Sequence, residues 1–171
     1  NDRLTPVSVV APAEASSLAL LPGNKQDHSV FIGAAFAEVS GSNLALTATA
    51  TASSTFSFRA PSFVNDGNPS TRWASDYNSA TPDNQWLLLD FGGQRQLSRV
   101  VIKWEAASAK EYVVELSSDG ATWSAIYSTS TGAGGNVDIP FATTSARYIR
   151  MTGTKRNTSA GYSIWELEAY A

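Results

Sequence analysis

The sequence predicts an all-β sandwich, and three observations support this fold class. Short segments in which apolar and polar residues alternate recur from Leu44 to the end of the chain, with turn-forming residues between them. No segment repeats its apolar residues at the helical spacing. Charged residues make up only 16% of the chain, against a usual ~25%, so uncharged Ser and Thr accompany the apolar residues, as in many strand-rich proteins.

The predicted strands are bounded by Gly, Asp, Asn or Ser residues. In chain order they cover residues 85–91, 98–104, 111–118, 123–127, 137–141, 146–151 and 163–169. Alternation in the third strand places Tyr112, Val114 and Leu116 on one face. Asp119 and Gly120 follow it and predict a two-residue hairpin turn, because both residue types tolerate a positive φ.

Residues 1–43 differ from the rest of the chain and are predicted to be an appendage. They contain three prolines and an Ala/Ser-rich stretch, and they lack Trp and Tyr. Two short strand-like pieces occur among them, so the segment is either the tail of a preceding domain or a set of extra strands on the main one. Residues 44–171 have the length of one domain.

Composition argues against several classes of function. A net charge of −3 gives no basic surface for a nucleic acid. The chain has no cysteine for disulfides or thiolate metal sites, and its single histidine, His28, is a poor basis for catalysis or metal binding. No apolar run approaches the ~20 residues of a membrane-spanning helix, and no export signal opens the chain. We therefore expect a soluble protein whose export signal was removed or lies upstream.

Six motifs occur in a fixed order along residues 44–171. They are Phe63-Val64-Asn65-Asp66-Gly67-Asn68-Pro69-Ser70-Thr71-Arg72-Trp73, Gln85-Trp86-Leu87, Asp90-Phe91-Gly92, Ser117-Ser118-Asp119-Gly120, Ala146-Arg147-Tyr148-Ile149-Arg150 and Gly161-Tyr162-Ser163-Ile164-Trp165-Glu166-Leu167. In these motifs the chain resembles the discoidin domains, also called coagulation factor V/VIII type C domains, and in particular the bacterial carbohydrate-binding modules of family 32. The resemblance implies a galactose-binding-like jelly-roll β-sandwich that is not catalytic and that binds its ligand through loops at one end.

The segment from Asp66 to Asn68 has two interpretations. Its oxygens could surround a hard cation, or it could be a simple Asp-Gly turn, which spacing alone favours. The resemblance implies instead a structural Ca²⁺ that joins the first long loop to the last strand. The implied ligands are the side chains of Asp66, Thr71 and Glu166 and backbone oxygens of Phe63, Asn68, Thr71 and Trp165.

Two loops are candidates for sugar binding. Residues 155–162 combine hydrogen-bond donors with an aromatic ring, and a pyranose needs both, because its apolar face stacks on a ring while its hydroxyls form hydrogen bonds. The other candidate begins at a Trp-Glu pair, which in similar modules of chitosan- and glucan-degrading enzymes contacts the sugar through its Glu. The predicted sugar-binding residues are Asp76, Tyr77, Trp104, Glu105, Arg156, Asn157 and Tyr162, with Tyr162 as the stacking ring. The alternative for residues 155–162 is a solvated hairpin loop in which Tyr162 packs inward.

The other tryptophans, Trp73, Trp86 and Trp123, are assigned to the core because they lie in strand patterns or beside turns. Phe56 or Phe58 occupies the place in the first loop where chitosan-binding relatives tend to carry an acidic residue. An ammonium-bearing sugar would then lose one counter-charge. A neutral β-glucan or a galactoside is therefore about as well supported as chitosan.

We therefore expect a non-catalytic carbohydrate-binding module, secreted by a bacterium, that directs an attached polysaccharide-degrading enzyme to its substrate. No set of acid, base and nucleophile in the sequence supports catalysis. The alternative is a discoidin-type adhesion module that binds phospholipid or protein, with Phe56, Phe58 and Arg59 as its apolar and basic contacts. The negative net charge and the lack of a disulfide count against membrane binding.

Overall fold

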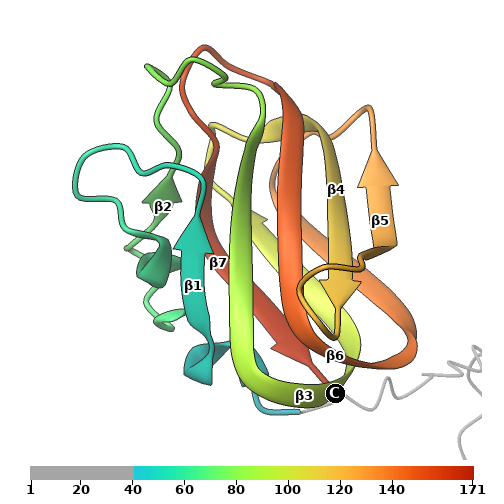
Figure 1. The fold of residues 1–171 in the computed structure, drawn as a ribbon. Coiled ribbons are helices and arrows are strands. Elements are labelled where there is room, and N and C mark those ends of the chain that lie inside the picture. Colours follow the sequence, from blue (N-terminus) through green and yellow to red (C-terminus); the bar gives the residue numbers. More distant parts are fainter. Residues whose placement is uncertain (1–40) are drawn as a thin grey trace, which may run out of the picture. The chain divides into compact units, whose positions relative to one another are not determined.

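The computed structural model describes residues 41–171, which form the two-layered β-sandwich predicted from the sequence (Figure 1). Residues 1–40, with His28 and most of the predicted appendage, lie outside the described part. Two short 3-10 helices and seven strands follow in order: η1 (Leu44–Thr47), β1 (Thr49–Ala52), η2 (Pro61–Asn65), β2 (Trp73–Ala74), β3 (Gln85–Trp104), β4 (Ala109–Ser117), β5 (Ser124–Thr129), β6 (Asn136–Arg156) and β7 (Ser163–Tyr170).

β3 and β6 are long strands that run through both layers. The first half of β3 pairs with β1 and with the second half of β6, whereas its second half pairs with β7 and with the first half of β6. One layer is therefore β1-β3-β6-β4-β5 and the other is β2-β7-β3-β6, with both long strands bending at the same end (Figure 1).

The bend in β3 corrects the predicted strand limits. The sequence pattern predicts two strands in place of β3, because Gly92 and Gly93 are typical of a strand end. It also predicts two strands, residues 137–141 and 146–151, in place of β6. In the structure the pairing register of β3 shifts between Asp90 and Arg95, and Gly92 has a φ of +72°. The glycine pair thus bends a continuous strand and does not end it.

The side chains between the layers form one hydrophobic core. The predicted inward face of β4 is confirmed, since Tyr112, Val114 and Leu116 are at most 4% exposed. Trp73 is completely buried in the same core, as predicted. The core assignment of Trp86 and Trp123 is wrong, because both are only partly buried.

Each of these two tryptophans has a physical reason to lie outside the core. Trp86 lies between the buried residues Gln85 and Leu87, so strand alternation turns its side chain to the opposite face. Trp123 precedes β5 and stacks against Arg150, whose guanidinium carbon lies 3.8 Å from the centre of the ring. A cation over the ring face is a favourable arrangement that does not require burial in the core.

The connection between β4 and β5 is six residues long, from 118 to 123, and not the predicted two. The Asp119 carboxylate accepts hydrogen bonds of 2.8 Å from the backbone N–H groups of Ala121 and Thr122. These bonds extend the turn beyond Gly120, which has the expected positive φ of +76°.

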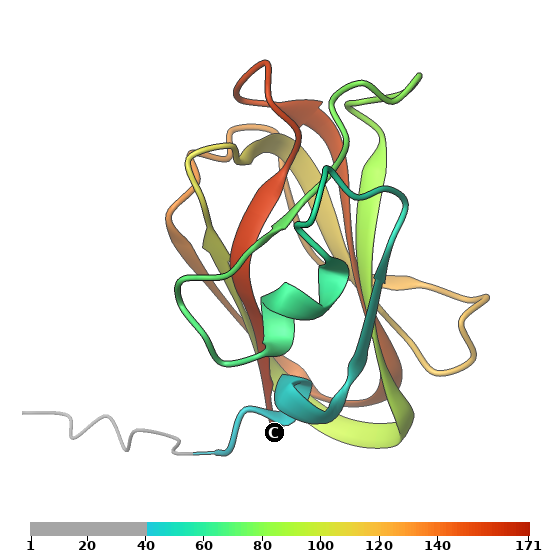
Figure 2. The same ribbon diagram turned by 90° about the vertical axis from the view of Figure 1, so that its left-hand side faces the viewer.

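Four loops gather at the end of the sandwich opposite to the bend in β3: residues 53–60, 75–84, 105–108 and 157–162 (Figure 2). Backbone hydrogen bonds run from Ser75 N–H to the Tyr162 carbonyl at 2.8 Å and from Asn157 N–H to the Ser108 carbonyl at 3.0 Å, and Phe56 N–H bonds to the Ala74 carbonyl at the end of β2 at 2.8 Å. The loops are thus held in a fixed relation to one another.

Among the described residues, no helix has the length and apolar character needed to cross a membrane.

Candidate functional site

A hollow of about 370 Å³ opens among these four loops, and we call it the loop-end hollow. Phe56 and Arg59 reach it from the loop after β1, and Arg72 and Tyr77 from either side of β2. Glu105 enters from the connection between β3 and β4, and small residues of the β6–β7 loop close the remaining side. Segments far apart in the sequence therefore build one polar and aromatic cavity.

The aromatic part of the hollow is a pair of rings. Tyr77 is 44% exposed, and its ring centre lies 4.8 Å from that of Phe56 at an interplanar angle of 43°. Phe56 is held in place by the backbone bond to Ala74. An exposed ring supported by a second ring offers a flat apolar surface to a planar or pyranose ligand.

The polar part of the hollow combines two cations with one anion. The guanidinium of Arg72 lies 3.9 Å from the carboxylate of Glu105, and both side chains are about three-quarters buried. Glu105 also accepts a hydrogen bond of 3.1 Å from the backbone N–H of Ala107, which fixes its direction. Arg59 forms no ion pair with any of the described residues. The donors of Arg59 and Arg72 and the acceptor Glu105 thus line the same hollow.

Tyr77 and Glu105 are the two predicted sugar-binding residues that line this hollow. Arg72 is a lining residue that the sequence analysis did not select. Arg72 directly precedes the buried Trp73. Because side chains alternate at the start of a strand, its position next to a core residue could have predicted that it faces outward.

Tyr162 does not act as an exposed stacking ring, and this prediction is wrong. Its side chain is completely buried, and its hydroxyl donates a hydrogen bond of 2.6 Å to the Asp83 carbonyl. The ring occupies the space beside Gly153, where a Cβ atom would collide with it. Burial raises the pKa of the Tyr162 hydroxyl. The alternative interpretation, in which Tyr162 packs inward, is the one that the structure supports.

Trp104 is likewise a core residue and not part of the loop-end hollow. It is 5% exposed, and its ring packs edge-on against Tyr112 with a centre-to-centre distance of 5.2 Å. Its place as the last residue of β3 suggested a loop position, but the strand alternation that buries Val100 and Ile102 continues to Trp104.

Three further predicted residues have structural contacts of their own. Arg156 pairs with Asp83 at 2.9 Å and donates to the carbonyl of Ser159. Asn157 donates to Ser108 Oγ at 2.9 Å, and Asp76 accepts from the backbone N–H of a residue in its own turn. None of the three lines the loop-end hollow. Arg156 and Asn157 shape the loop that borders it.

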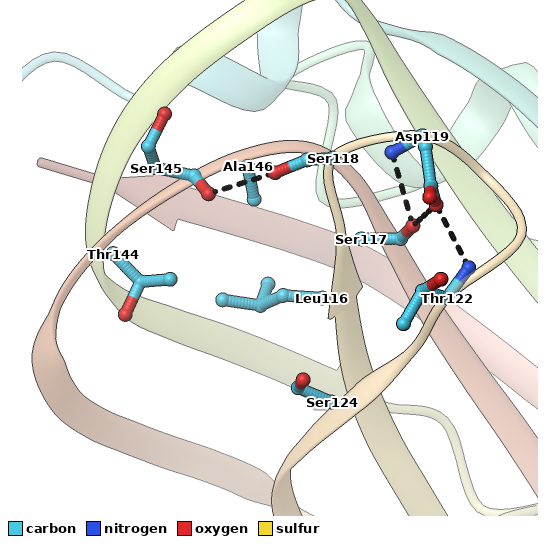
Figure 3. A pocket seen from close by; sticks show the side chains of 9 residues that line it. All are labelled: Leu116, Ser117, Ser118, Asp119, Thr122, Ser124, Thr144, Ser145 and Ala146. Carbon is cyan, nitrogen blue, oxygen red and sulfur yellow. Dashed lines mark hydrogen bonds between the residues drawn. The ribbon is translucent and has the colours of Figure 1, made fainter.

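A separate hollow of about 210 Å³ lies at the opposite end of β4 (Figure 3). Its lining includes Ser117, Asp119 and Ser145, and the hydrogen bond from the Ser117 hydroxyl to the Asp119 carboxylate belongs to the turn itself. The backbone N–H groups of Thr122 and Ala121 hold the pKa of Asp119 down at about 2. Asp119 Oδ1 already accepts three hydrogen bonds within the turn, so we favour the loop-end hollow as the functional site.

Four of the predicted metal ligands, Asp66, Asn68, Thr71 and Glu166, form a third cluster. Asp66 accepts hydrogen bonds from the Asn68 backbone at 2.9 Å and from the Thr71 hydroxyl at 2.7 Å. Glu166 on β7 is only 4% exposed, and neither of its carboxylate oxygens has a hydrogen-bond partner among the described residues. Burial, together with the nearby Asp66 carboxylate, raises the pKa of Glu166 to about 7.

This cluster fits the chemistry of a hard cation. A buried, unpartnered carboxylate beside a second carboxylate is costly unless a positive charge compensates it. The described residues contain no group of three or more His, Cys, Asp or Glu side chains arranged for a metal. The remaining ligands would therefore be hydroxyl and carbonyl oxygens, which Ca²⁺ accepts readily.

Comparison with known proteins gives consistent results. Residues 48–167 match the family model of the F5/8 type C domain. The chain is similar to chitosan-binding module 1 of a chitosanase/glucanase from Paenibacillus sp. IK-5, with 42% identity and a TM-score of 0.71 over 75% of this chain and 98% of that one. Module 2 of that enzyme, in complex with chitotriose, is 39% identical, with a TM-score of 0.69 over 75% of this chain and 100% of that one.

A curated relative is much longer than this chain. The polysaccharide lyase 8 family protein HylA of Enterococcus faecalis is 31% identical over 122 residues, which are 64% of this chain and 8% of that protein. The chain thus matches only a small part of the length of HylA.

Proposed function

Because the chain belongs to the F5/8 type C domain family, we propose that it is a carbohydrate-binding module whose loop-end hollow binds sugar units of a polysaccharide. The observation that carries this proposal is the exposed ring of Tyr77 beside Arg72 and Glu105 in a rigid frame of loops. Stacking on a ring with a few placed hydrogen-bonding groups is the usual way to hold a pyranose. The similarity to two chitosan-binding modules supports the same ligand class.

The proposed ligand is an oligosaccharide of the chitosan or β-glucan type, with a galactoside as the remaining option. Glu105 is the one carboxylate in the lining of the hollow, against two arginines, Arg59 and Arg72. One carboxylate provides a single counter-charge for the ammonium group of glucosamine. The hollow therefore suits one charged amino sugar or a neutral glucose unit, and it does not suit a dense row of ammonium groups.

The proposed biological role is to hold a polysaccharide-degrading enzyme on its substrate outside the cell. The similar modules are described as parts of a chitosanase/glucanase, and HylA is far longer than the segment that matches this chain. A shallow site binds a single sugar weakly, but attachment to a catalytic domain raises the local concentration of that domain at the polymer.

We also propose that Ca²⁺ binds between the loop after η2 and β7. Phe63, Asp66, Asn68, Thr71, Trp165 and Glu166 would supply the oxygens. The support is the buried Glu166 carboxylate, which has no hydrogen-bond partner among the described residues and lies near Asp66. The ion would link segments about 100 residues apart and would stabilise the fold without taking part in sugar binding.

Calorimetric titration of the full chain tests the proposed binding. Oligosaccharides of chitosan, laminarin and a galactoside are the probes, and we expect one of them to bind. Tyr77→Ala should abolish that binding, whereas Tyr77→Phe, which keeps the ring, should retain most of it. Equal binding by Tyr77→Ala and the wild-type chain would show that the loop-end hollow is not the site.

One observation favours a second candidate function, the binding of anionic phospholipid. Phe58 is 77% exposed, and the guanidinium carbon of Arg59 lies 5.8 Å from the centre of its ring. An apolar spike beside a cation is typical of loops that enter a membrane surface. Sedimentation with phosphatidylserine vesicles, in which the sugar-binding module should remain in the supernatant, separates the two functions.

A further inference from the structure

A second hollow adjoins the loop-end hollow. It measures about 280 Å³, and its lining includes Phe58, Arg59, Arg72 and Trp165. Arg59 and Arg72 also line the loop-end hollow. We call this cavity the Phe58 hollow, and the two shared arginines place it directly beside the loop-end hollow.

Phe58 is the most exposed large hydrophobic side chain in the described part of the chain. It stands in a loop whose backbone is well held, because Arg59 N–H bonds to the Phe56 carbonyl and Ala60 N–H to the Phe58 carbonyl. Between the two phenylalanines, Ser57 has a φ of +56°, which is uncommon for a residue other than glycine. The turn at Ser57 thus separates Phe56 in one hollow from Phe58 in the next.

The two shared arginines still have donors available at the junction. The guanidinium carbon of Arg72 lies 5.3 Å from the centre of the Trp165 ring, and its Nε has no hydrogen-bond partner among the described residues. Arg59 makes no side-chain hydrogen bond or ion pair there either, and its guanidinium lies beside Phe58. Arg72 Nε itself is too buried to reach a ligand, so the exposed parts of the two guanidinium groups are the donors that line the hollows.

We propose that the Phe58 hollow is a second sugar subsite, which binds the unit adjacent to the one on Tyr77. This inference rests on the proposed function, since it needs a saccharide in the loop-end hollow. Phe58 and Trp165 supply apolar faces for the second ring, and Arg59 and Arg72 donate to oxygens near the glycosidic link. Its position directly beside the loop-end hollow favours the next unit of the same oligosaccharide as the occupant.

The test is the dependence of affinity on oligosaccharide length. The full chain is titrated with glucosamine and its oligomers of two to four units, and with glucose and the matching laminari-oligosaccharides. The wild-type chain should bind the dimer roughly 3- to 10-fold more tightly than the monomer, as expected for about 1 kcal/mol from one additional stacked ring. Phe58→Ala should remove this gain and leave the affinity for the monomer unchanged.

The chain offers a control for the loss of exposed apolar surface. Leu46 is 51% exposed and lies outside the linings of both hollows, so Leu46→Ala should keep the full gain from monomer to dimer. Both variants remove a side chain that faces solvent, and their melting temperatures should match that of the wild-type chain within a few degrees.

The outcomes separate this inference from the proposed function. Monomer binding without a gain for the dimer, or an equal loss of monomer and dimer affinity in Phe58→Ala, would overturn the second subsite and leave the first in place. No binding to any member of either series, with no binding to the galactoside probe either, would overturn both. Unchanged sugar affinities in Phe58→Ala, with loss of binding to phosphatidylserine vesicles, would show that Phe58 contacts a membrane and not a sugar.

Discussion

The hydroxyl of Tyr162 donates a hydrogen bond of 2.6 Å to the carbonyl oxygen of Asp83, and the two residues together fix the β6–β7 loop. Asp83 also pairs with Arg156 through its side chain, at 2.9 Å. Tyr162 therefore affects the proposed sugar site without lining it, since its buried ring positions the loop residues that border the loop-end hollow.

This contact predicts a clear difference between two substitutions. Tyr162→Phe removes one hydrogen bond and should lower the free energy of unfolding by about 1 kcal/mol, with oligosaccharide affinity unchanged. Tyr162→Ala leaves a cavity in the core and should cost roughly 3–5 kcal/mol. Urea unfolding measures both values. Loss of sugar binding in a well-folded Tyr162→Phe protein would contradict this prediction and show that the hydrogen bond to Asp83, in addition to the ring, is needed to position the loop.

The charge of Glu105 should distinguish an amino sugar from a neutral one. Glu105→Gln removes the counter-charge for an ammonium group, so affinity for chitosan oligomers should fall roughly 5- to 10-fold, as a partly exposed charge-assisted bond suggests. Affinity for laminari-oligosaccharides should change by less than about twofold. Titration of both series measures the difference.

Asp76→Asn is the matched control for Glu105→Gln. Asp76 was also predicted to bind sugar, but it lies outside the lining of the loop-end hollow and accepts a bond from the backbone N–H of Asn78. Its substitution should leave both affinities unchanged. A loss for chitosan oligomers as large as that of Glu105→Gln would place Asp76 in the site after all.

Calcium should stabilise the chain through Glu166. A ligand at 100 times its dissociation constant adds about 2.7 kcal/mol, which for a domain of this size raises Tm by roughly 5–10 °C. Glu166→Gln should lose this response to Ca²⁺. The EDTA-treated variant should be at least as stable as the EDTA-treated wild-type chain, because it no longer buries an uncompensated carboxylate.

A neighbouring acid on the same strand provides the control. Glu168 bonds to Lys103 and to the Tyr170 hydroxyl, so Glu168→Gln should keep the Ca²⁺ response. Calorimetric scans with and without EDTA compare the variants. Equal Ca²⁺ responses in wild-type and Glu166→Gln proteins would contradict the proposed ion site.

The strands from β3 onward could be predicted because alternation is a local property of the sequence, whereas the short strands β1 and β2 were not predicted. The inward face of β4 and the burial of Trp73 follow from it directly. The continuity of β3 could not be predicted, since Gly92 permits both a turn and a bend, and pairing with β6 decides between them. The length of the β4–β5 turn depended on the side chain of Asp119, whose bonds to later N–H groups leave no periodic signal.

The candidate site was only partly predictable for a different reason. Tyr77 and Tyr162 are both aromatic residues in loops beside strands, and the sequence does not distinguish them. The structure does so through a distant glycine, because Gly153 on β6 leaves the space into which Tyr162 packs, whereas Tyr77 remains 44% exposed. Which loop aromatic faces the ligand is thus set by contacts between residues that are far apart in the chain.

The turn around Asp119 should make stability depend on pH in acid. Hydrogen bonds from Thr122 and Ala121 lower its pKa from 3.8 to about 2, so its stabilising contribution is complete above pH 3.8 and is lost as the pH falls through 2. Asp119→Asn can still accept the backbone bonds but does not titrate. The free energy of unfolding of the wild-type chain should therefore exceed that of the variant by more at pH 5 than at pH 2, as measured by urea titration. A difference that stays constant over this range would show that the Asp119 charge has no part in holding the turn, because the other carboxylates titrate in both proteins and cancel in the difference.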